Sequence, residues 1–147
     1  MIKSVGAITN KNLEAQNLIE KIQIGFENLP KTTSSLQVAY LIWRKPFMVA
    51  AKNTFIDAML SQIGLCNVFA DKERYPETTL AELADKKPDY IFLSSEPYPF
   101  KEKHIAELQT ACPNSKVLLV DGEMFSWYGS RLLKSCEYFQ KLLLTLF

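Results

Sequence analysis

The sequence lacks the patterns that would indicate a metal framework, a nucleic-acid partner or a membrane span. Its three cysteines, Cys66, Cys112 and Cys136, are far apart and show no CxxC or Cys/His spacing, so we expect buried free thiols rather than a zinc site or disulfides. Seventeen Lys and Arg against sixteen Asp and Glu give a net charge of +1, which disfavours attraction to nucleic acid or membrane surfaces. No apolar run approaches the ~20 residues of a membrane span.

An export signal is also missing from the sequence. The N-terminal stretch MIKSVGAITNKNLEAQ has no apolar core of signal-peptide length. We therefore expect a soluble chain of 147 residues, long enough for one domain that buries roughly two-thirds of its unfolded surface.

Recognisable catalytic motifs are equally scarce. The sequence contains no Ser/His/Asp triad, GxSxG elbow, Walker A loop or GxGxxG. The single histidine, His104, stands in the charged stretch KEKHIAE and is predicted to lie on the solvated face of a helix. Asp71, Asp89 and Asp121 are conceivable metal ligands, but Asp89 opens a strand and Asp121 precedes a turn glycine, so both have structural roles. Catalysis, a resident cofactor and a metal site are therefore unsupported.

What is present is organised around residues 36–64. A nearly continuous apolar run over 36–43 predicts a strand that helices cover on both faces, and hence a parallel sheet. Residues 44–52 are predicted to form a loop, and residues 54–63 a helix that ends at Gly64. In parallel sheets the loops that leave the carboxyl ends of the strands line the ligand crevice, so the residues after Ile42 are the first functional candidates.

The rest of the chain repeats this pattern of strand and helix. A helix with one apolar face is predicted over 8–29, with Thr9 or Asn10 as its N-cap, and further strands over 90–93 and 117–120. Residues 67–69 could form a short edge strand, and helices are predicted over 103–111 and from about Ser130 onward. The fold class is therefore α/β, with three α/β/α layers around a mainly parallel sheet of about four strands, preceded by a long connecting helix.

Large aromatic side chains are unusually frequent in the loops that follow the predicted strands. Loops ordinarily carry Gly, Asn, Asp and Ser, and a ring left in water contributes nothing to folding. Gathered on one rim, such rings would make an apolar wall for a flat or bulky ligand. The alternative is that they fold back over the ends of the sheet. The aromatic residues concerned are Trp43, Phe47, Tyr98, Phe100, Phe125, Trp127 and Tyr128.

Four segments in order resemble the C-terminal lobe of the helical-backbone (class III) solute-binding proteins of ABC importers, with the cobalamin-binding branch as the nearest likeness. They are VGAITNKNLEAQNLIEKI, YLIWRKPFMVAAKNTFIDAML with GLCNVF behind it, YPETTLAELADKKPDYIFLSSEP, and VLLVDGEMFSWYGSRLL. Together these segments cover almost the whole chain. The resemblance implies a two-lobed protein that holds its ligand between the lobes, in the periplasm or cell envelope.

On this resemblance, residues 1–30 would be the connecting helix and residues 31–147 the C-terminal lobe, with the N-terminal lobe absent from the chain. The resemblance also implies a metal-chelate ligand, a corrinoid first and haem or a ferric siderophore next, carried as cargo rather than as a cofactor. The expected ligand contacts are Trp43, Arg44, Phe47, Tyr98, Phe125 and Trp127.

The family docks on the membrane subunits of its transporter through a carboxylate on each lobe. In the FSWYGSR stretch, where the cobalamin-binding members are expected to carry that acid, this sequence has Ser126. Glu96 or Glu123 would then supply a nearby charge for docking. The alternative function is a small α/β enzyme that works at the same crevice, with Glu96 or Asp121 as a base.

Overall fold

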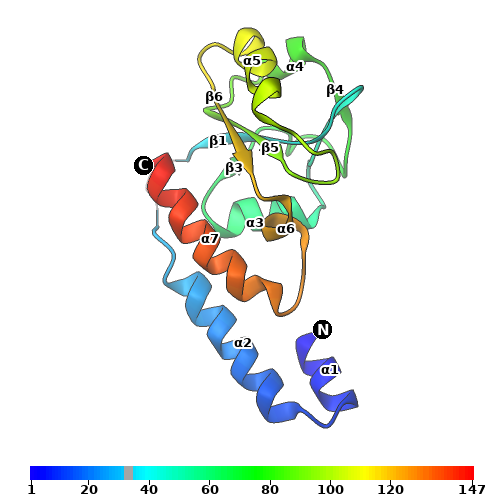
Figure 1. The fold of residues 1–147 in the computed structure, drawn as a ribbon, viewed down its shortest axis with the longest axis vertical. Helices are drawn as coiled ribbons and strands as arrows, with labels where there is room; N and C mark the ends of the chain where they lie inside the picture. The colour runs from blue at the N-terminus through cyan, green and yellow to red at the C-terminus, as the bar shows by residue number, and fades with distance from the viewer. Residues whose placement is uncertain (32–34) are drawn as a thin grey trace. The chain divides into compact units, whose positions relative to one another are not determined.

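The computed structural model describes residues 1–31 and 35–147, and Figure 1 shows its helices and strands. The chain divides into two compact units. Unit 1 comprises Met1–Lys31 together with Ser126–Phe147, and unit 2 comprises Thr32–Phe125. Unit 1 is helical, whereas unit 2 holds the sheet. The division at residue 30 into a connecting helix and a lobe stays a prediction.

The parallel strands of unit 2 lie where the apolar runs predict them. Strands β3 (Cys66–Asn67), β1 (Gln37–Trp43), β5 (Tyr90–Ser94) and β6 (Lys116–Val120) pair in that order, all parallel. Within the sheet Val38 lies opposite Tyr90, and Ile91 lies opposite Val117. Five consecutive residues of β1 are buried, which is why its sequence shows no alternation. The predicted α/β fold with a mainly parallel sheet is confirmed.

An antiparallel extension was not predicted. Strand β2 (Phe47–Val49) returns alongside β1, with Val49 opposite Leu41, and β4 (Glu77–Thr78) pairs with β2. The expectation of a plain loop over residues 44–52 is therefore wrong. Three residues are too few to show a period, and their pairing partners come from the tertiary fold. As a consequence, β1 ends in a hairpin rather than in an open loop.

Helices cover both faces of this sheet (Figure 1). One face carries a cluster in which Leu41 and Leu93 of the strands pack with Leu83 of α4 (Leu80–Asp85) and Leu108 of α5 (Glu102–Ala111). On the opposite face lie α3 (Phe55–Gln62) and α6 (Gly122–Ser126). Helix α3 begins at its N-cap Thr54, whose side chain accepts a hydrogen bond from the Asp57 N–H, and the chain leaves it through residue 64.

In unit 1, the helix predicted over 8–29 corresponds to one helix, α2, and a short helix that was not predicted, α1, precedes it. Helix α1 (Ile2–Ile8) ends before Asn10, whose positive φ of 56° breaks the helical path, and α2 (Asn12–Glu27) begins after Lys11. The predicted N-cap at Thr9 or Asn10 is therefore wrong. Asparagine is one of the few non-glycine residues that adopt this conformation readily.

Helix α2 packs against α7 (Arg131–Leu146), as Figure 1 shows. The Phe26 and Phe139 rings lie 6.3 Å apart, and the Cys136 thiol lies 3.8 Å from the Ile22 carbonyl oxygen. A methyl group added at Gly25 would lie 2.7 Å from the Cys136 sulfur, so the glycine permits this close approach. The apolar stripe of α2 is thus partly covered by a neighbouring helix, with Ile22 buried and Phe26 half-buried.

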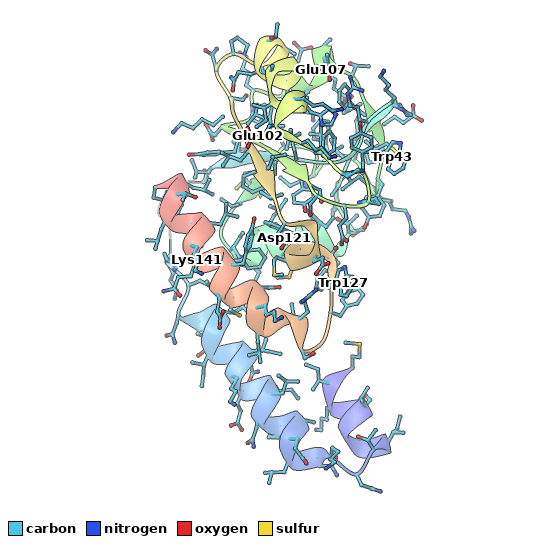
Figure 2. All side chains as sticks on the ribbon, viewed as in Figure 1. Trp43, Glu102, Glu107, Asp121, Trp127 and Lys141 are labelled. Atoms are coloured by element: carbon cyan, nitrogen blue, oxygen red, sulfur yellow. The ribbon has the colours of Figure 1, made fainter. Side chains whose placement is uncertain are left out.

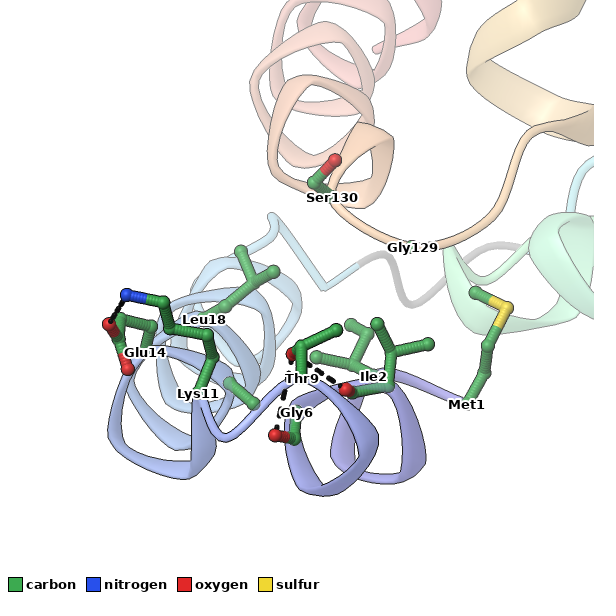
Figure 3. A pocket seen from close by; sticks show the side chains of 11 residues that line it. Met1, Ile2, Gly6, Thr9, Lys11, Glu14, Leu18, Gly129 and Ser130 are labelled. Atoms are coloured by element: carbon green, nitrogen blue, oxygen red, sulfur yellow. Dashed lines mark hydrogen bonds and ion pairs between the residues drawn. The ribbon is translucent and has the colours of Figure 1, made fainter.

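A groove of about 320 Å³ lies between α1 and α2, and Gly129 and Ser130 close one side of it (Figure 3). Its walls include Ile2 and Leu18. The exposed side chains of Val5, Ile8 and Leu13 belong to the same two helices.

Two global expectations can also be compared with the structure. Cys112 and Cys136 are buried free thiols, and burial raises the pKa of both, whereas Cys66 is partly exposed and also free. Across ranges 1–31 and 35–147, no helix combines the length and the apolar character needed to cross a bilayer.

Candidate functional site

The carboxyl ends of β1 and β5 bring two of the predicted ligand contacts together. Trp43, the last residue of β1, meets Tyr98 edge-on, with ring centroids 5.7 Å apart. The Tyr98 N–H donates to the Ile42 carbonyl oxygen at 3.3 Å, which fixes the loop after β5 against the end of β1. Trp43, which is labelled in Figure 2, remains 39% exposed, and Tyr98 is half-buried, so the pair presents aromatic surface to solvent.

Arg44 stands beside this pair in the turn between β1 and β2. Its Nε donates to Glu107 Oε2 of α5 at 2.9 Å, and both side chains are largely shielded from water. This hydrogen bond to Glu107 raises the pKa of Arg44, and the Tyr98 hydroxyl raises it further. The guanidinium carries five N–H donors, of which Glu107 uses one and the Tyr98 hydroxyl is a second partner. The remaining donors retain the capacity to bind an anionic group of a ligand.

The structure contradicts the predicted solvent exposure of His104. The residue is buried at 6% exposure near the start of α5, and its ring packs edge-on against Tyr98 and Phe100 at 5.5 Å each. Nδ1 accepts the Lys101 N–H at 2.9 Å, and Nε2 lies 3.3 Å from the Tyr98 hydroxyl oxygen. Burial lowers the pKa of His104, and the neighbouring charges of Lys103 and Arg44 act in the same direction.

His104 and Glu107 are the residues that the sequence analysis missed at this site. Both were assigned to a solvated helix face because the surrounding residues are charged. The signal that could have found His104 is its position, three residues after the N-cap Lys101, where a side chain can bind the N-cap N–H. The aromatic residues Tyr98 and Phe100 just before the helix then supply its cover.

Phe47 and Phe125 do not join the exposed pair in the same way. Phe47 in β2 is partly buried and packs at the margin of the core. Phe125 is completely buried, with its ring 5.0 Å from Tyr40 and 6.1 Å from Phe92. The expectation that Phe125 presents an open ring is therefore wrong. Helix α6 places the Phe125 ring against Tyr40 and Phe92 of the sheet, and the sequence pattern does not indicate this contact.

Trp127 belongs to unit 1 rather than to unit 2. It is 48% exposed, and the Arg131 guanidinium lies 5.0 Å from its ring centre, within range of a cation–π contact. Its role in ligand binding stays a prediction, supported in this structure only by its exposure.

The two predicted docking acids come from neighbouring strand ends. Glu96 follows β5, and Glu123 lies in the first turn of α6 after β6. Both are half-buried, and the Glu123 N–H donates to Asp121 Oδ1 at 3.0 Å. Gly122 packs so closely on Glu96 that an added methyl would lie 2.6 Å from its Cγ. The hydrogen bond from the Glu123 N–H gives Asp121 a structural role in the turn.

A metal centre is not indicated in the part of the chain that the structure describes. Within it, no three or more His, Cys, Asp or Glu side chains are grouped so that they could hold a metal ion. The chemistry that the site offers is therefore stacking on Trp43 and Tyr98, together with charge from Arg44.

Solved structures of binding proteins share this fold. A possible iron-binding (periplasmic solute-binding) protein from Staphylococcus epidermidis matches with a TM-score of 0.78 at 20% identity, over 99% of this chain and 60% of that one. The periplasmic heme-binding protein of Vibrio cholerae matches with 0.77 at 20% identity, over 96% and 60%. The periplasmic vitamin B12 binding protein of the same organism matches with 0.64 at 18% identity, over 93% and 53%.

The chain thus spans about 53–60% of the length of these structures. No curated protein matches it. The model of the periplasmic binding protein family matches residues 1–122, which is most of the sequence. The resemblance that the four sequence segments indicate is confirmed, and the chain belongs to the periplasmic binding protein family.

Proposed function

We propose that this chain supplies one wall of the ligand site in a solute-binding protein of an ABC importer that carries a metal chelate. The observation that carries the proposal is the half-exposed pair of Trp43 and Tyr98 at adjacent strand ends, with Arg44 beside it. Such a surface suits a flat macrocycle with anionic or polar substituents. A corrinoid is the first candidate, and haem and a ferric siderophore follow.

Structural relatives support the chelate class without selecting within it. They include a heme-binding protein, a vitamin B12 binding protein and a protein of an Fe3+-hydroxamate transport system. A role as a binding protein rather than an enzyme, with export to the periplasm or cell envelope, forms part of this proposal. The match to the periplasmic binding protein family supports this part of the proposal.

The ligand class is tested by titration with cyanocobalamin, haemin and a ferric hydroxamate. The solved relatives are longer than this chain. We therefore titrate two samples, the 147-residue chain and a longer natural protein that includes its sequence. Calorimetry and tryptophan fluorescence follow the binding. We expect one chelate to bind the longer protein, and the isolated chain to bind it more weakly, since one wall leaves half of the ligand in water. If all three chelates bind with a Kd above about 1 mM, which corresponds to a binding free energy of about 4 kcal/mol, the metal-chelate class is excluded.

The site is tested by Trp43→Ala. We expect this variant to weaken chelate binding by more than about 1 kcal/mol, roughly fivefold in Kd, because aromatic anchors dominate such contacts. Tyr75→Ala is a matched control, because Tyr75 is 40% exposed in the same unit but is not part of the aromatic pair. Equal effects of the two substitutions would show that the wall lies elsewhere.

Transporter docking through Glu96 and Glu123 belongs to the same proposal. The double variant Glu96→Gln and Glu123→Gln should lower binding to membranes that contain the importer, because amides cannot pair with arginines as ions. Chelate affinity should stay unchanged in this variant. Unaltered membrane binding would remove these two acids from the docking surface.

A further inference from the structure

The imidazole of His104 is held at both ring nitrogens between the start of α5 and the aromatic pair. Nδ1 accepts the Lys101 N–H at 2.9 Å, so the proton of the neutral ring sits on Nε2. Nε2 then donates toward the Tyr98 hydroxyl oxygen, 3.3 Å away. Phe100 packs edge-on against the same ring at an interplanar angle of 88°. The ring therefore has one orientation that satisfies all of its neighbours.

Tyr98 transmits this constraint to the exposed surface. Its ring contacts His104 on one side and Trp43 on another, with centroids 5.5 Å and 5.7 Å away. It also meets Phe100 at 4.7 Å. Trp43 itself is bounded by solvent over 39% of its surface, so Tyr98 is a principal contact that fixes how the indole is presented.

We propose that His104 is a positioning residue for the candidate ligand site, which orients Trp43 through Tyr98 as long as its imidazole is neutral. The inference rests on the proposed function in so far as the Trp43 surface is a ligand wall. A second proton would be added at Nδ1, where it would face the Lys101 N–H, and two donors repel. Protonation thus breaks the contact that anchors the ring and loosens Tyr98.

The surroundings of His104 favour this response. Lys103 on α5 and Arg44 in the β1–β2 turn oppose a positive ring, whereas Glu107 on α5 favours one. Glu107 is itself bound by Arg44, and Glu82 on the neighbouring α4 is paired with Lys72. The ring is buried as well, which also opposes the charged form. Neutral His104 is therefore the state in which the site is assembled near pH 7.

The experiment follows Trp43 directly and needs no ligand. The chain contains two tryptophans, so incorporation of 5-fluorotryptophan gives two ¹⁹F signals, which Trp127→Phe assigns. Between pH 7.5 and 5 we expect the Trp43 signal to shift with a midpoint below 6.5, while the Trp127 signal in unit 1 serves as an internal reference. This window stays above the ordinary pKa of carboxyl groups, near 4.

His104→Gln separates positioning from helix capping. Glutamine three residues after the N-cap can accept the Lys101 N–H as in a capping box, but it does not titrate. The Trp43 signal should then lose its dependence on pH. Tyr98→Phe, which keeps the ring and removes the hydroxyl, should abolish at least half of the shift. Thr79→Ala, which removes the N-cap of α4, controls for mild destabilisation and should leave the shift intact.

An unshifted Trp43 signal in the natural chain, or an equal shift in His104→Gln, would overturn the inference. These outcomes are distinct from failure of the proposed function. If no chelate binds but Trp43 follows His104, the ligand class is wrong and the positioning stands. If a chelate binds and Trp43 does not respond to His104, the positioning is wrong and the function stands.

Discussion

Two aromatic groups in unit 2 begin from similar sequence and end in different environments. Trp43 and Tyr98 stay partly exposed, whereas Phe125 packs on Tyr40 and Phe92 in the core. All of the loop aromatics follow apolar strands, so composition alone does not separate them. The difference lies in what comes after each strand. A tight hairpin follows β1 and leaves Trp43 at its edge, whereas a helix follows β6 and directs Phe125 under the sheet.

The comparison teaches that exposure, rather than position after a strand, distinguishes a ring that is accessible to a ligand from a structural one. The buried group interlocks with no open surface, because Tyr40, Phe92 and Phe125 are each fully buried. The exposed group is held by polar contacts in addition to its ring contacts, through His104 and the Ile42 carbonyl. We therefore expect substitutions in the first group to change stability and those in the second to change binding.

The largest effect should come from Phe125→Ala. Removal of a fully buried ring loses its transfer free energy and leaves a cavity, for a loss of about 3–5 kcal/mol in the free energy of unfolding. Trp43→Ala should cost only about 1 kcal/mol, because water already reaches much of that ring. Urea denaturation of both variants measures the difference. Equal losses in the free energy of unfolding would mean that Phe125 and Trp43 contribute equally to stability despite their different burial.

Gly122→Ala should have the next largest effect. An added methyl group would contact the Ser94 hydroxyl and lie 2.6 Å from Glu96 Cγ and 3.1 Å from the Glu96 nitrogen. Overpacking of this kind typically costs about 1–3 kcal/mol. Thermal unfolding tests the prediction, with Met124→Ala on the same short helix as a comparison. A melting temperature like that of the natural chain would show that the Glu96 loop moves aside freely.

Tyr40→Phe tests the polar contact inside the buried group. The Tyr40 hydroxyl lies 3.2 Å from Ser94 Oγ, and both residues are inaccessible to solvent. Loss of this hydrogen bond should lower the free energy of unfolding by about 1 kcal/mol. Tyr98→Phe should cost less, because Tyr98 is only half-buried and its hydrogen bond to His104 is the longer of the two at 3.3 Å. Chemical denaturation of the Tyr40→Phe and Tyr98→Phe variants measures both losses in the free energy of unfolding. A larger loss for Tyr98→Phe would contradict the view that the buried group determines stability.

Sequence reasoning found the parallel strands because long apolar runs such as that of β1 carry their own signal. It did not find β2, whose three residues become a strand only by pairing with β1. The site was predicted in the same uneven way. Trp43, Arg44 and Tyr98 became candidates from their place after strands, whereas the burial of His104 depends on Tyr98 and Phe100 folding over it.

Phe125 shows the same limit from the other direction. The segment GEMFS contains too few residues for a helical period, so its one turn of helix is set by tertiary contacts. The Gly122 N–H donates to Ser95 Oγ at 2.9 Å, and Glu123 binds back to Asp121. These contacts join residues far apart in sequence or depend on a local turn, and neither leaves a pattern that hydrophobic periodicity can reveal.

The smallest effect expected is the pH dependence that His104 contributes to stability. Burial lowers its pKa in the folded chain below the ordinary 6.5, so at acid pH the unfolded chain binds a proton that the folded chain does not. This contribution is therefore fully favourable above pH 6.5 and is lost as the pH falls from 6.5 toward the lowered pKa. His104→Gln should flatten that part of the profile, measured by urea denaturation between pH 7.5 and 5. Stability in this window should fall because of the same proton that displaces Trp43. A stability profile of His104→Gln as steep as that of the natural chain would therefore show that another group titrates here. It would also mean that a neutral imidazole does not hold the exposed aromatic pair.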